Sequence, residues 1–155
     1  MLIELRLFLF RASFWIDKNN NVHIGVLKNS KEVVAGIADW NNRNPNKTGE
    51  LLKNKQIVMT KGGRCHPRTA IGYDSSKRWL TFVVVDGRRK GHSKGVMLYE
   101  LAKIMKQRGC SRAINLDGGG STIMIAKDGN STKTINRPSG NAHRPIPVMI
   151  GIKLK

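Results

Sequence analysis

The chain has 155 residues, which is the length of one domain with a substantial core. With 39% hydrophobic and 25% charged residues it has the composition of a folded globular protein, and no apolar run approaches the roughly 18 residues that a membrane span requires. Its 28 lysines and arginines against 10 acidic residues give a net charge of +18, which suggests a nucleic-acid partner. The basic residues, however, are spread over nearly every segment, and the few aromatic residues form no stacking platform among them. We therefore expect only non-specific attraction to nucleic acid.

The first ten residues are apolar but are interrupted by Glu4 and Arg6. They lack the basic start and the small-residue cleavage site of a signal peptide, so a buried first strand is the better interpretation and localisation stays undecided. The two cysteines, Cys65 and Cys110, have no metal-ligand spacing, and their separation does not show whether they pair. We expect Cys110 to pack as a small apolar group, and we expect no metal or cofactor site.

Apolar runs separated by turn-forming residues predict a series of short strands. Residues 13–16 and 22–26 flank a turn rich in Asp and Asn, as in a β-hairpin. Residues 79–85 are nearly all apolar and β-branched, which predicts a central strand buried on both faces. The remaining strand candidates are residues 33–38, 56–59, 68–73, 113–116, 123–126, 132–135 and 148–152.

One helix is predicted, over about 95–108, because its apolar residues recur on one face and Gly109 follows it. A long polar loop rich in asparagine covers residues 39–49, and long loops inside compact domains are often functional. The fold class is therefore α+β, with a twisted, mixed or mostly antiparallel sheet of about eight strands packed with one main helix. We expect a single domain over residues 1–155.

The stretch from Asn115 to Thr122 has the composition of a ligand-binding loop. An apolar run leads to Asp117, three glycines follow, and Ser121 and Thr122 precede another β-branched run. Consecutive glycines allow positive φ and close approach of a ligand, and their N–H groups can form a concave nest for an anion. The loop joins strand to strand, which excludes a Walker or dinucleotide motif because both of these open a helix. The alternative is a tight hairpin whose glycines serve only the turn.

Two acidic residues, Asp86 and Asp117, each follow an apolar strand and precede a glycine. The other acids lie in turns, on a solvated helix face (Glu100), or, like Glu50, without polar neighbours that suggest a site; Asp39, beside the asparagine-rich loop, is a reserve candidate. Arginine binds phosphate through a planar, bidentate fork, so carboxylates, arginines and a glycine nest together predict a site for a phosphorylated ligand. The alternative is that both aspartates form buried ion pairs with arginines and catalyse nothing. The arginines concerned are Arg68, Arg88, Arg137 and Arg144.

A series of motifs in fixed order makes the function more specific. The series consists of HPRTAIG (66–72), VVDGR (84–88), residues 93–95 before the helix, NLDGGGST (115–122), NRPS (136–139) and RP (144–145). It closely resembles the phosphodiester glycosidase domain family, over about residues 13–155 and most densely from His66 onward. Family domains usually carry a further N-terminal segment, for which we find no equivalent here, so we expect a truncated or minimal version. Family members are also commonly exported.

The resemblance implies hydrolysis of a glycosyl phosphodiester at the anomeric carbon. Asp117 is then the nucleophile or base, and Asp86 is its partner or orients a sugar hydroxyl and an arginine; a retaining and an inverting route both remain open. Two alternatives stay: a non-catalytic carbohydrate- or phosphate-binding module of the same fold, and, with less support, a basic nucleic-acid-binding protein. The residues expected to bind substrate or phosphate are Arg68, Thr69, Arg88, Ser93, Gly118, Gly119, Gly120, Ser121, Thr122, Asn136, Arg137 and Arg144.

Overall fold

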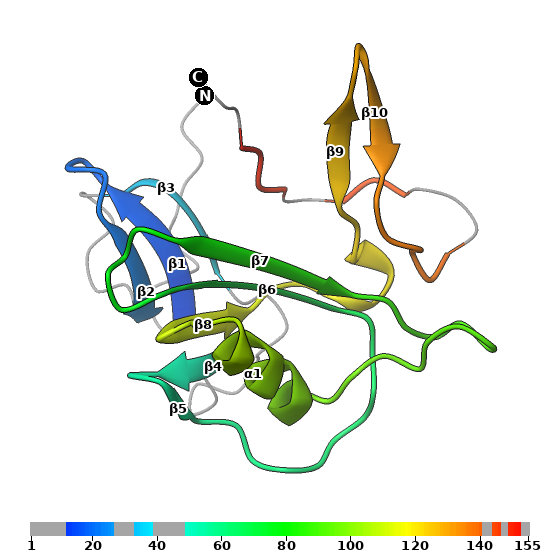
Figure 1. Cartoon of the computed structure of the whole chain (residues 1–155), viewed down its shortest axis with the longest axis horizontal. Helices are drawn as coiled ribbons and strands as arrows, with labels where there is room; N and C mark the ends of the chain where they lie inside the picture. Colours follow the sequence, from blue (N-terminus) through cyan, green and yellow to red (C-terminus); the bar gives the residue numbers. More distant parts are fainter. Residues whose placement is uncertain (1–11, 27–32, 39–48, 141–143, 147–148, 153–155) are drawn as a thin grey trace.

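A computed structural model describes residues 12–26, 33–38, 49–140, 144–146 and 149–152. Within these residues the chain forms ten strands, one α-helix and one short 3₁₀ turn, and the strands form three separate sheets (Figure 1). The predicted α+β class with mostly antiparallel pairing is confirmed. The single sheet of about eight strands is wrong, because the strands divide into groups of five, three and two.

The largest sheet has five strands in the order β5-β4-β8-β6-β7, and all four of its pairings are antiparallel. On one face it is covered by helix α1, Leu98–Gln107 (Figure 1). Leu101, Ala102 and Met105 of the helix are fully buried there with Ala70 and Ala113 of the sheet. The strands of this sheet are β4 (Glu50–Lys53), β5 (Gln56–Ile57), β6 (Arg68–Tyr73), β7 (Leu80–Val85) and β8 (Arg112–Asn115).

The opposite face of this sheet packs against a three-stranded sheet of order β2-β1-β3. Phe14 and Ile24 from the small sheet join Ile71 and Ile114 in a second buried cluster. Neighbouring residues of β6 and β8 thus enter different clusters, which is the two-residue alternation of a strand with both faces covered. The strands of the small sheet are β1 (Ala12–Asp17), β2 (Val22–Val26) and β3 (Val33–Ala38).

The third sheet is the hairpin of β9, Ile125–Asp128, and β10, Ser131–Thr134, which projects away from the other layers (Figure 1). It follows the 3₁₀ turn Gly119–Ser121, and two apolar residues, Ile125 in β9 and Ile135 directly after β10, are exposed. Both strands were predicted within one or two residues, and the expected connection of strand to strand through the glycine loop is confirmed.

Two strand predictions need correction. Strand β7 lies at the edge of its sheet, paired with β6, and most of its residues are only half-buried. Its apolar pattern arises because Phe82 packs on one core cluster while Val83 and Val85 pack on the other, so both faces are covered although the strand is not central. Residues 149–152 form no strand and are exposed, and Val148 lies outside the described residues.

The helix begins later than expected because the residues before it have another role. Val96 forms a β-bridge with His66, and Gly95 (φ 93°) packs so closely on the His66 backbone that no side chain fits there. Glu100 was expected on a solvated face, but its carboxylate accepts a hydrogen bond from the Met97 N–H, 2.8 Å away, at the helix start. Gly109 (φ 84°) follows the helix, as predicted.

Three further expectations concern single residues or segments. Cys110 is buried, Cys65 is exposed, and both are free thiols. Glu50, expected to lack polar neighbours, forms an ion pair with Arg112 between the two larger sheets. The predicted first strand and the asparagine-rich loop through residue 48 lie outside the described residues. No helix in the described part of the chain is long and apolar enough to span a membrane.

Candidate active site at one edge of the five-stranded sheet

Antiparallel pairing brings the predicted site residues together at one end of the strands of the five-stranded sheet, where β6 begins and β7 and β8 end. Arg68 pairs with Val85 and Ala70 with Asn115, so the start of β6 lies beside the ends of β7 and β8. Asp86 follows β7 directly, and Asp117 comes two residues after β8. Backbone hydrogen bonds hold the glycine loop to the segment before β6: the Leu116 N–H donates to the Thr69 carbonyl and the Gly119 N–H to the Pro67 carbonyl, at 2.8 and 2.9 Å.

The three glycines differ in how much room a side chain would have: a Cβ would clash with backbone at Gly118, crowd a flexible arginine at Gly119, and make an ordinary contact with an arginine at Gly120. A Cβ atom on Gly118 would lie 2.8 Å from the Pro67 carbonyl oxygen. Gly119 has φ 60°, and a Cβ there would lie 3.1 Å from Nη1 of Arg88. At Gly120 it would lie 3.4 Å from Cζ of Arg144. Two guanidinium groups therefore lie directly against the loop.

The N–H groups of the loop are largely used inside the protein. Gly118 N–H donates to Oδ1 of Asp117 at 2.9 Å, and Ser121 and Thr122 donate to carbonyls of the turn itself. Together with the bond from Gly119 to Pro67, four amides of the expected anion nest already have internal acceptors. The phosphate-binding role of the loop stays a prediction; four of its amides have internal acceptors, and two guanidinium groups lie against it.

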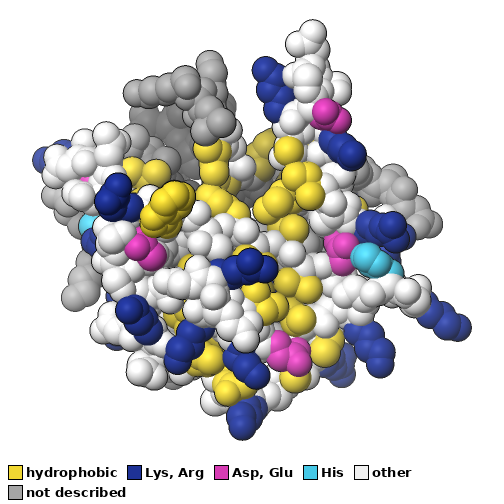
Figure 2. All heavy atoms as spheres, in the orientation of Figure 1, with side chains coloured by type: hydrophobic (Ala, Val, Ile, Leu, Met, Phe, Trp, Pro, Cys, Tyr) yellow, Lys and Arg dark blue, Asp and Glu magenta, His cyan; other side chains and the backbone are white. Residues whose placement is uncertain are grey.

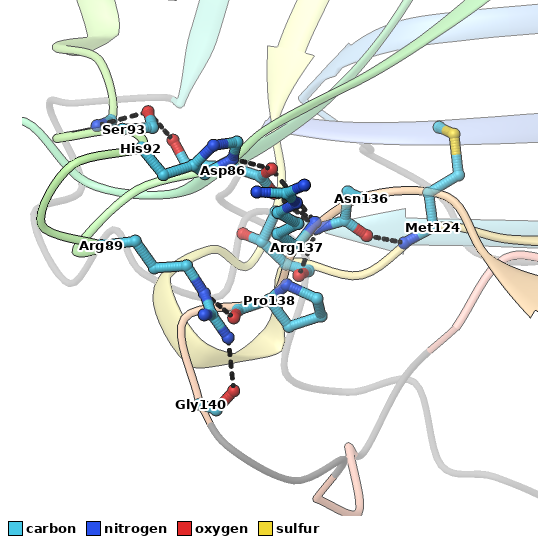
Figure 3. A network of polar contacts seen from close by, with 11 residues as sticks. Asp86, Arg89, His92, Ser93, Met124, Asn136, Arg137, Pro138 and Gly140 are labelled. Atoms are coloured by element: carbon cyan, nitrogen blue, oxygen red, sulfur yellow. Dashed lines mark hydrogen bonds and ion pairs between the residues drawn. The ribbon is translucent and has the colours of Figure 1, made fainter.

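Asp86 is the centre of a hydrogen-bond network that joins two loops (Figure 3). Its Oδ1 accepts from Nδ2 of Asn136 at 2.9 Å and its Oδ2 from Nε2 of His92 at 2.9 Å, while the Arg137 N–H lies 3.0 Å from both oxygens. Burial raises the pKa of Asp86, but these hydrogen bonds lower it by more, so the carboxyl titrates below its ordinary value of 3.8. Asn136 also accepts from the Met124 N–H and donates to the Thr122 carbonyl.

Two further side chains of the loop after β7 have structural partners. The Ser93 hydroxyl donates to the Asp86 carbonyl at 2.6 Å and accepts from the Gly95 N–H at 3.1 Å, which fixes the loop before α1. Arg89 donates to the carbonyls of Pro138 and Gly140, at 2.7 and 3.2 Å (Figure 3). Arg89 had no predicted role, yet it holds together the loops that surround Asp86.

The remaining predicted residues lie around the glycine loop. Arg144 donates from Nη2 to the Ser121 hydroxyl at 2.8 Å, and the Thr69 hydroxyl lies 3.5 Å from that of Thr122. Nη2 of Arg88 lies 3.1 Å from Nδ1 of His66, a motif residue for which the sequence predicted no role. Arg68 donates to the carbonyls of Val96 and Arg64, both at 3.2 Å, and so supports the segment that carries His66.

The structure thus divides the predicted residues into two groups. The first group lies on or against the glycine loop that begins at Asp117, and it consists of Arg88, Arg144, Ser121, Thr69 and Thr122. The second group makes hydrogen bonds with Asp86, and it consists of Asn136, the Arg137 backbone and Ser93. The partners of Asp86 are an imidazole, an amide and a backbone N–H, so the alternative, a buried ion pair with an arginine, is not what this network shows.

Sequence reasoning missed the histidines of both groups, His66 and His92. His92 comes six residues after Asp86, across a turn closed by hydrogen bonds between Arg89 and Ser93, and this spacing was the available signal. Within the described residues no group of three or more His, Cys, Asp or Glu side chains is placed to hold a metal ion.

Comparison with known proteins gives a consistent result. A family model for phosphodiester glycosidase matches residues 10–153. The mouse N-acetylglucosamine-1-phosphodiester alpha-N-acetylglucosaminidase is 28% identical over 117 residues, which are 76% of this chain and 19% of that protein. The SPbeta prophage-derived protein YomE of Bacillus subtilis is 38% identical over 81 residues, 52% of this chain and 12% of YomE.

Among solved structures, this fold is similar to the catalytic domain of the zebrafish N-acetylglucosamine-1-phosphodiester alpha-N-acetylglucosaminidase, auto-inhibited by its pro-peptide. The TM-score is 0.57 at 26% identity, over 73% of this chain and 41% of the zebrafish chain. The chain therefore spans about a fifth of the mouse enzyme and less than half of the zebrafish domain.

Proposed function

Because the chain belongs to the phosphodiester glycosidase family, we propose that it hydrolyses a glycosyl phosphodiester at the anomeric carbon of the sugar. One observation carries the proposal beyond family membership: the guanidinium groups of Arg88 and Arg144 lie against adjacent glycines, directly after Asp117 in the chain. A loop that begins with a carboxylate and holds two guanidinium groups suits a reaction with a phosphate leaving group, because the cations can stabilise the charge on that group.

The reaction breaks the bond between the anomeric carbon and the phosphate oxygen, and the oxygen of water takes its place on the carbon. The leaving group is a phosphate monoester, which carries the bonding electrons away and needs less protonation than an ordinary sugar alcohol. Arg88 and Arg144 stabilise the negative charge that grows on this group. In an inverting route a carboxylate accepts the proton of the attacking water. In a retaining route the carboxylate first displaces the phosphate from the carbon, and water then displaces the carboxylate and releases its proton to solvent.

We assign that carboxylate to Asp117 and a positioning role to Asp86. Asp86 accepts hydrogen bonds from three donors on two segments, so a nucleophilic attack by its oxygens would break the network that holds both loops. Asp117 lies at the start of the glycine loop, next to the residues on which the two guanidinium groups lie. As nucleophile it gives a retaining reaction, and as base for water an inverting one.

The names of the relatives suggest the substrate for a first experiment, a methyl phosphodiester of N-acetylglucosamine-1-phosphate. We expect the purified chain to release N-acetylglucosamine and methyl phosphate, measured by phosphorus NMR. The anomer of the first sugar product, observed by proton NMR before it equilibrates, distinguishes a retaining from an inverting route. Absence of turnover, with a folded protein and unchanged substrate, would contradict the proposal.

A non-catalytic module that binds carbohydrate or phosphate is the second candidate. It is kept because the match covers only 19% of the mouse enzyme and 41% of the zebrafish chain. In that case the same substrate binds without being cleaved, which a titration followed by NMR detects. Specific nucleic-acid binding has less support, because lysines and arginines are scattered over the face in Figure 2 instead of forming one patch.

A further inference from the structure

The side chain of His66 makes a contact that fixes its protonation state. Nη2 of Arg88 lies 3.1 Å from Nδ1 of His66. A guanidinium group has five N–H donors and no acceptor, so Nδ1 has to be the acceptor and cannot carry a proton. The proton of the neutral ring is therefore on Nε2.

Arg88 is held in place on both sides of its guanidinium group. His66 accepts from one side, and the other side lies against Gly119, where a Cβ atom would approach Nη1 to 3.1 Å. The backbone of Arg88 has φ 56°, a left-handed conformation that is costly for a side chain with a Cβ. The two contacts, one on each side, set the direction in which the guanidinium group points.

Three positive charges of the described residues act on His66. Arg64 and Arg68 come from the segment that leads into β6, and Arg88 comes from the loop after β7. Desolvation, followed by these three guanidinium groups, lowers the pKa of His66 below its ordinary value of 6.5. His66 is consequently neutral at physiological pH, which is the form that can accept from Arg88.

We propose that neutral His66 is a positioning residue that aims the Arg88 guanidinium at the substrate phosphate, and that its protonation sets the acid limit of phosphate binding. This rests on the proposed function in one respect only, the role of Arg88 as a phosphate ligand. Protonation of Nδ1 replaces an acceptor by a donor, so the hydrogen bond to Arg88 is lost and two positive charges then face each other.

The tautomer is tested first, and without substrate. Nitrogen-15 shifts of the imidazole rings report which ring nitrogen carries the proton. We expect the Nε2–H form for His66 and a single titration below pH 6.5. In Arg88→Ala the Nδ1–H form of His66 should become populated, and the ring should titrate at a higher pH than in the unmodified protein. A Nδ1–H ring in the unmodified protein would overturn the proposal.

Binding is tested with dimethyl phosphate, whose single negative charge is constant between pH 4 and 8. The affinity of the unmodified protein should fall about tenfold as the pH drops through the His66 titration. His66→Ala should show that loss at every pH. In His66→Asn the amide oxygen replaces Nδ1 as acceptor and does not titrate, so the affinity should be retained and the acid limit should disappear. His23→Gln, which alters a histidine bound to Asp17 on another sheet, should behave like the unmodified protein.

A double-mutant cycle isolates the coupling between the two side chains. Once Arg88 is replaced by alanine, His66→Ala should cause no further loss of affinity. Additive losses would overturn the proposal, and so would an affinity that rises on acidification, because His66 would then bind the anion directly as a cation. No binding of dimethyl phosphate at any pH overturns the phosphate role of Arg88. Hydrolysis is not needed for either readout, so an inactive but binding protein contradicts the proposed function alone.

Discussion

The two strand-end aspartates have similar sequence neighbours and different surroundings. Both follow an apolar strand and both precede glycine. Asp86 accepts from donors six and about fifty residues away along the chain, and it thereby joins the loop after β7 to the loop after β10. Asp117 accepts locally from Gly118, at the start of a loop on which two arginines lie. The comparison teaches that a position at a strand end does not determine the role of a carboxylate; the donors that surround it do.

The largest expected effect separates the two aspartates by activity. Asp117→Asn should reduce hydrolysis at least a hundredfold and leave the melting temperature nearly unchanged, since a positioned acid or base typically contributes that much and the replacement is almost isosteric. Turnover of the glycosyl phosphodiester and thermal unfolding are the two measurements. Retention of more than about a tenth of the activity would remove Asp117 from the nucleophile or base role.

The matched variant, Asp86→Asn, should act mainly on stability. An amide group places N–H donors where the carboxylate accepted from Asn136, His92 and Arg137, so at least one hydrogen bond is lost, and we expect a cost of about 1–3 kcal/mol in the free energy of unfolding. Denaturant titration measures this cost. If Asp86→Asn is fully stable and inactive, the roles assigned to the two aspartates have to be exchanged.

The same network predicts how stability depends on pH. The pKa of Asp86 is lower in the folded than in the unfolded chain, so the unfolded state binds its proton first as the pH falls. The stability that Asp86 contributes is complete when the pH is above 3.8, the ordinary pKa of the group. It is lost as the pH falls through the lower pKa that Asp86 has in the folded protein. Melting temperatures of the unmodified protein and Asp86→Asn should therefore converge below pH 3.8. A constant difference down to pH 2.5 would show that Asp86 is not the group responsible.

Two neighbouring arginines sharpen the comparison, because each belongs to a different region. Arg88→Lys keeps the charge but loses the planar fork, so the affinity for dimethyl phosphate should fall about tenfold while stability changes little. Arg89→Lys breaks the hydrogen bonds to Pro138 and Gly140, so it should lower the melting temperature and leave the affinity of the folded protein unchanged. Equal effects of the two changes on affinity would contradict the separation into two regions.

A smaller effect is expected from the glycine that lies beneath Arg88. Gly119→Ala adds a methyl group 3.1 Å from Nη1 and should displace the guanidinium, lowering the affinity for dimethyl phosphate about three- to tenfold. Gly129→Ala is the control, because Gly129 has the same φ of 60° in the β9–β10 turn and no atom near the added methyl. Both variants should lose about 1 kcal/mol of stability from the left-handed backbone. Unchanged affinity in Gly119→Ala would make the glycines structural only.

Much of the fold could be predicted from local patterns. Strand β6 was predicted with its observed bounds, and α1 and the β1–β2 hairpin nearly so, because each combines a clear hydrophobic period with turn or stop residues. The position of β7 at the sheet edge could not be predicted. A strand with both faces covered has the same apolar sequence pattern whether it is central or at the edge of its sheet. Strand β4 was missed because it has only four residues, two of them charged.

For the site, the sequence identified residues that come together but not what they do there. The substrate-binding role of Ser93 stays a prediction; what the sequence did not reveal is that its hydroxyl also closes the loop before α1. His66 acquires its role only through Arg88, which is twenty-two residues away in the chain. Hydrogen bonds over such separations depend on the register of β6 against β7, and residue composition does not encode that register by itself.

The smallest expected effect tests whether geometry matters at all. Lys106 is exposed near the end of α1, and Lys106→Glu changes the net charge by two units, more than any arginine variant above. If the protein attracts phosphate through diffuse positive charge, this change should be the most damaging, and its effect should shrink as salt is added. If Arg88 and Arg144 form a defined site, affinity for dimethyl phosphate should change less than about twofold at ordinary salt, where charges are screened over about 10 Å. The measurement is the affinity of Lys106→Glu and Arg88→Lys at two salt concentrations. A larger loss in Lys106→Glu would contradict the site on the glycine loop, and with it the distinction between the two aspartates.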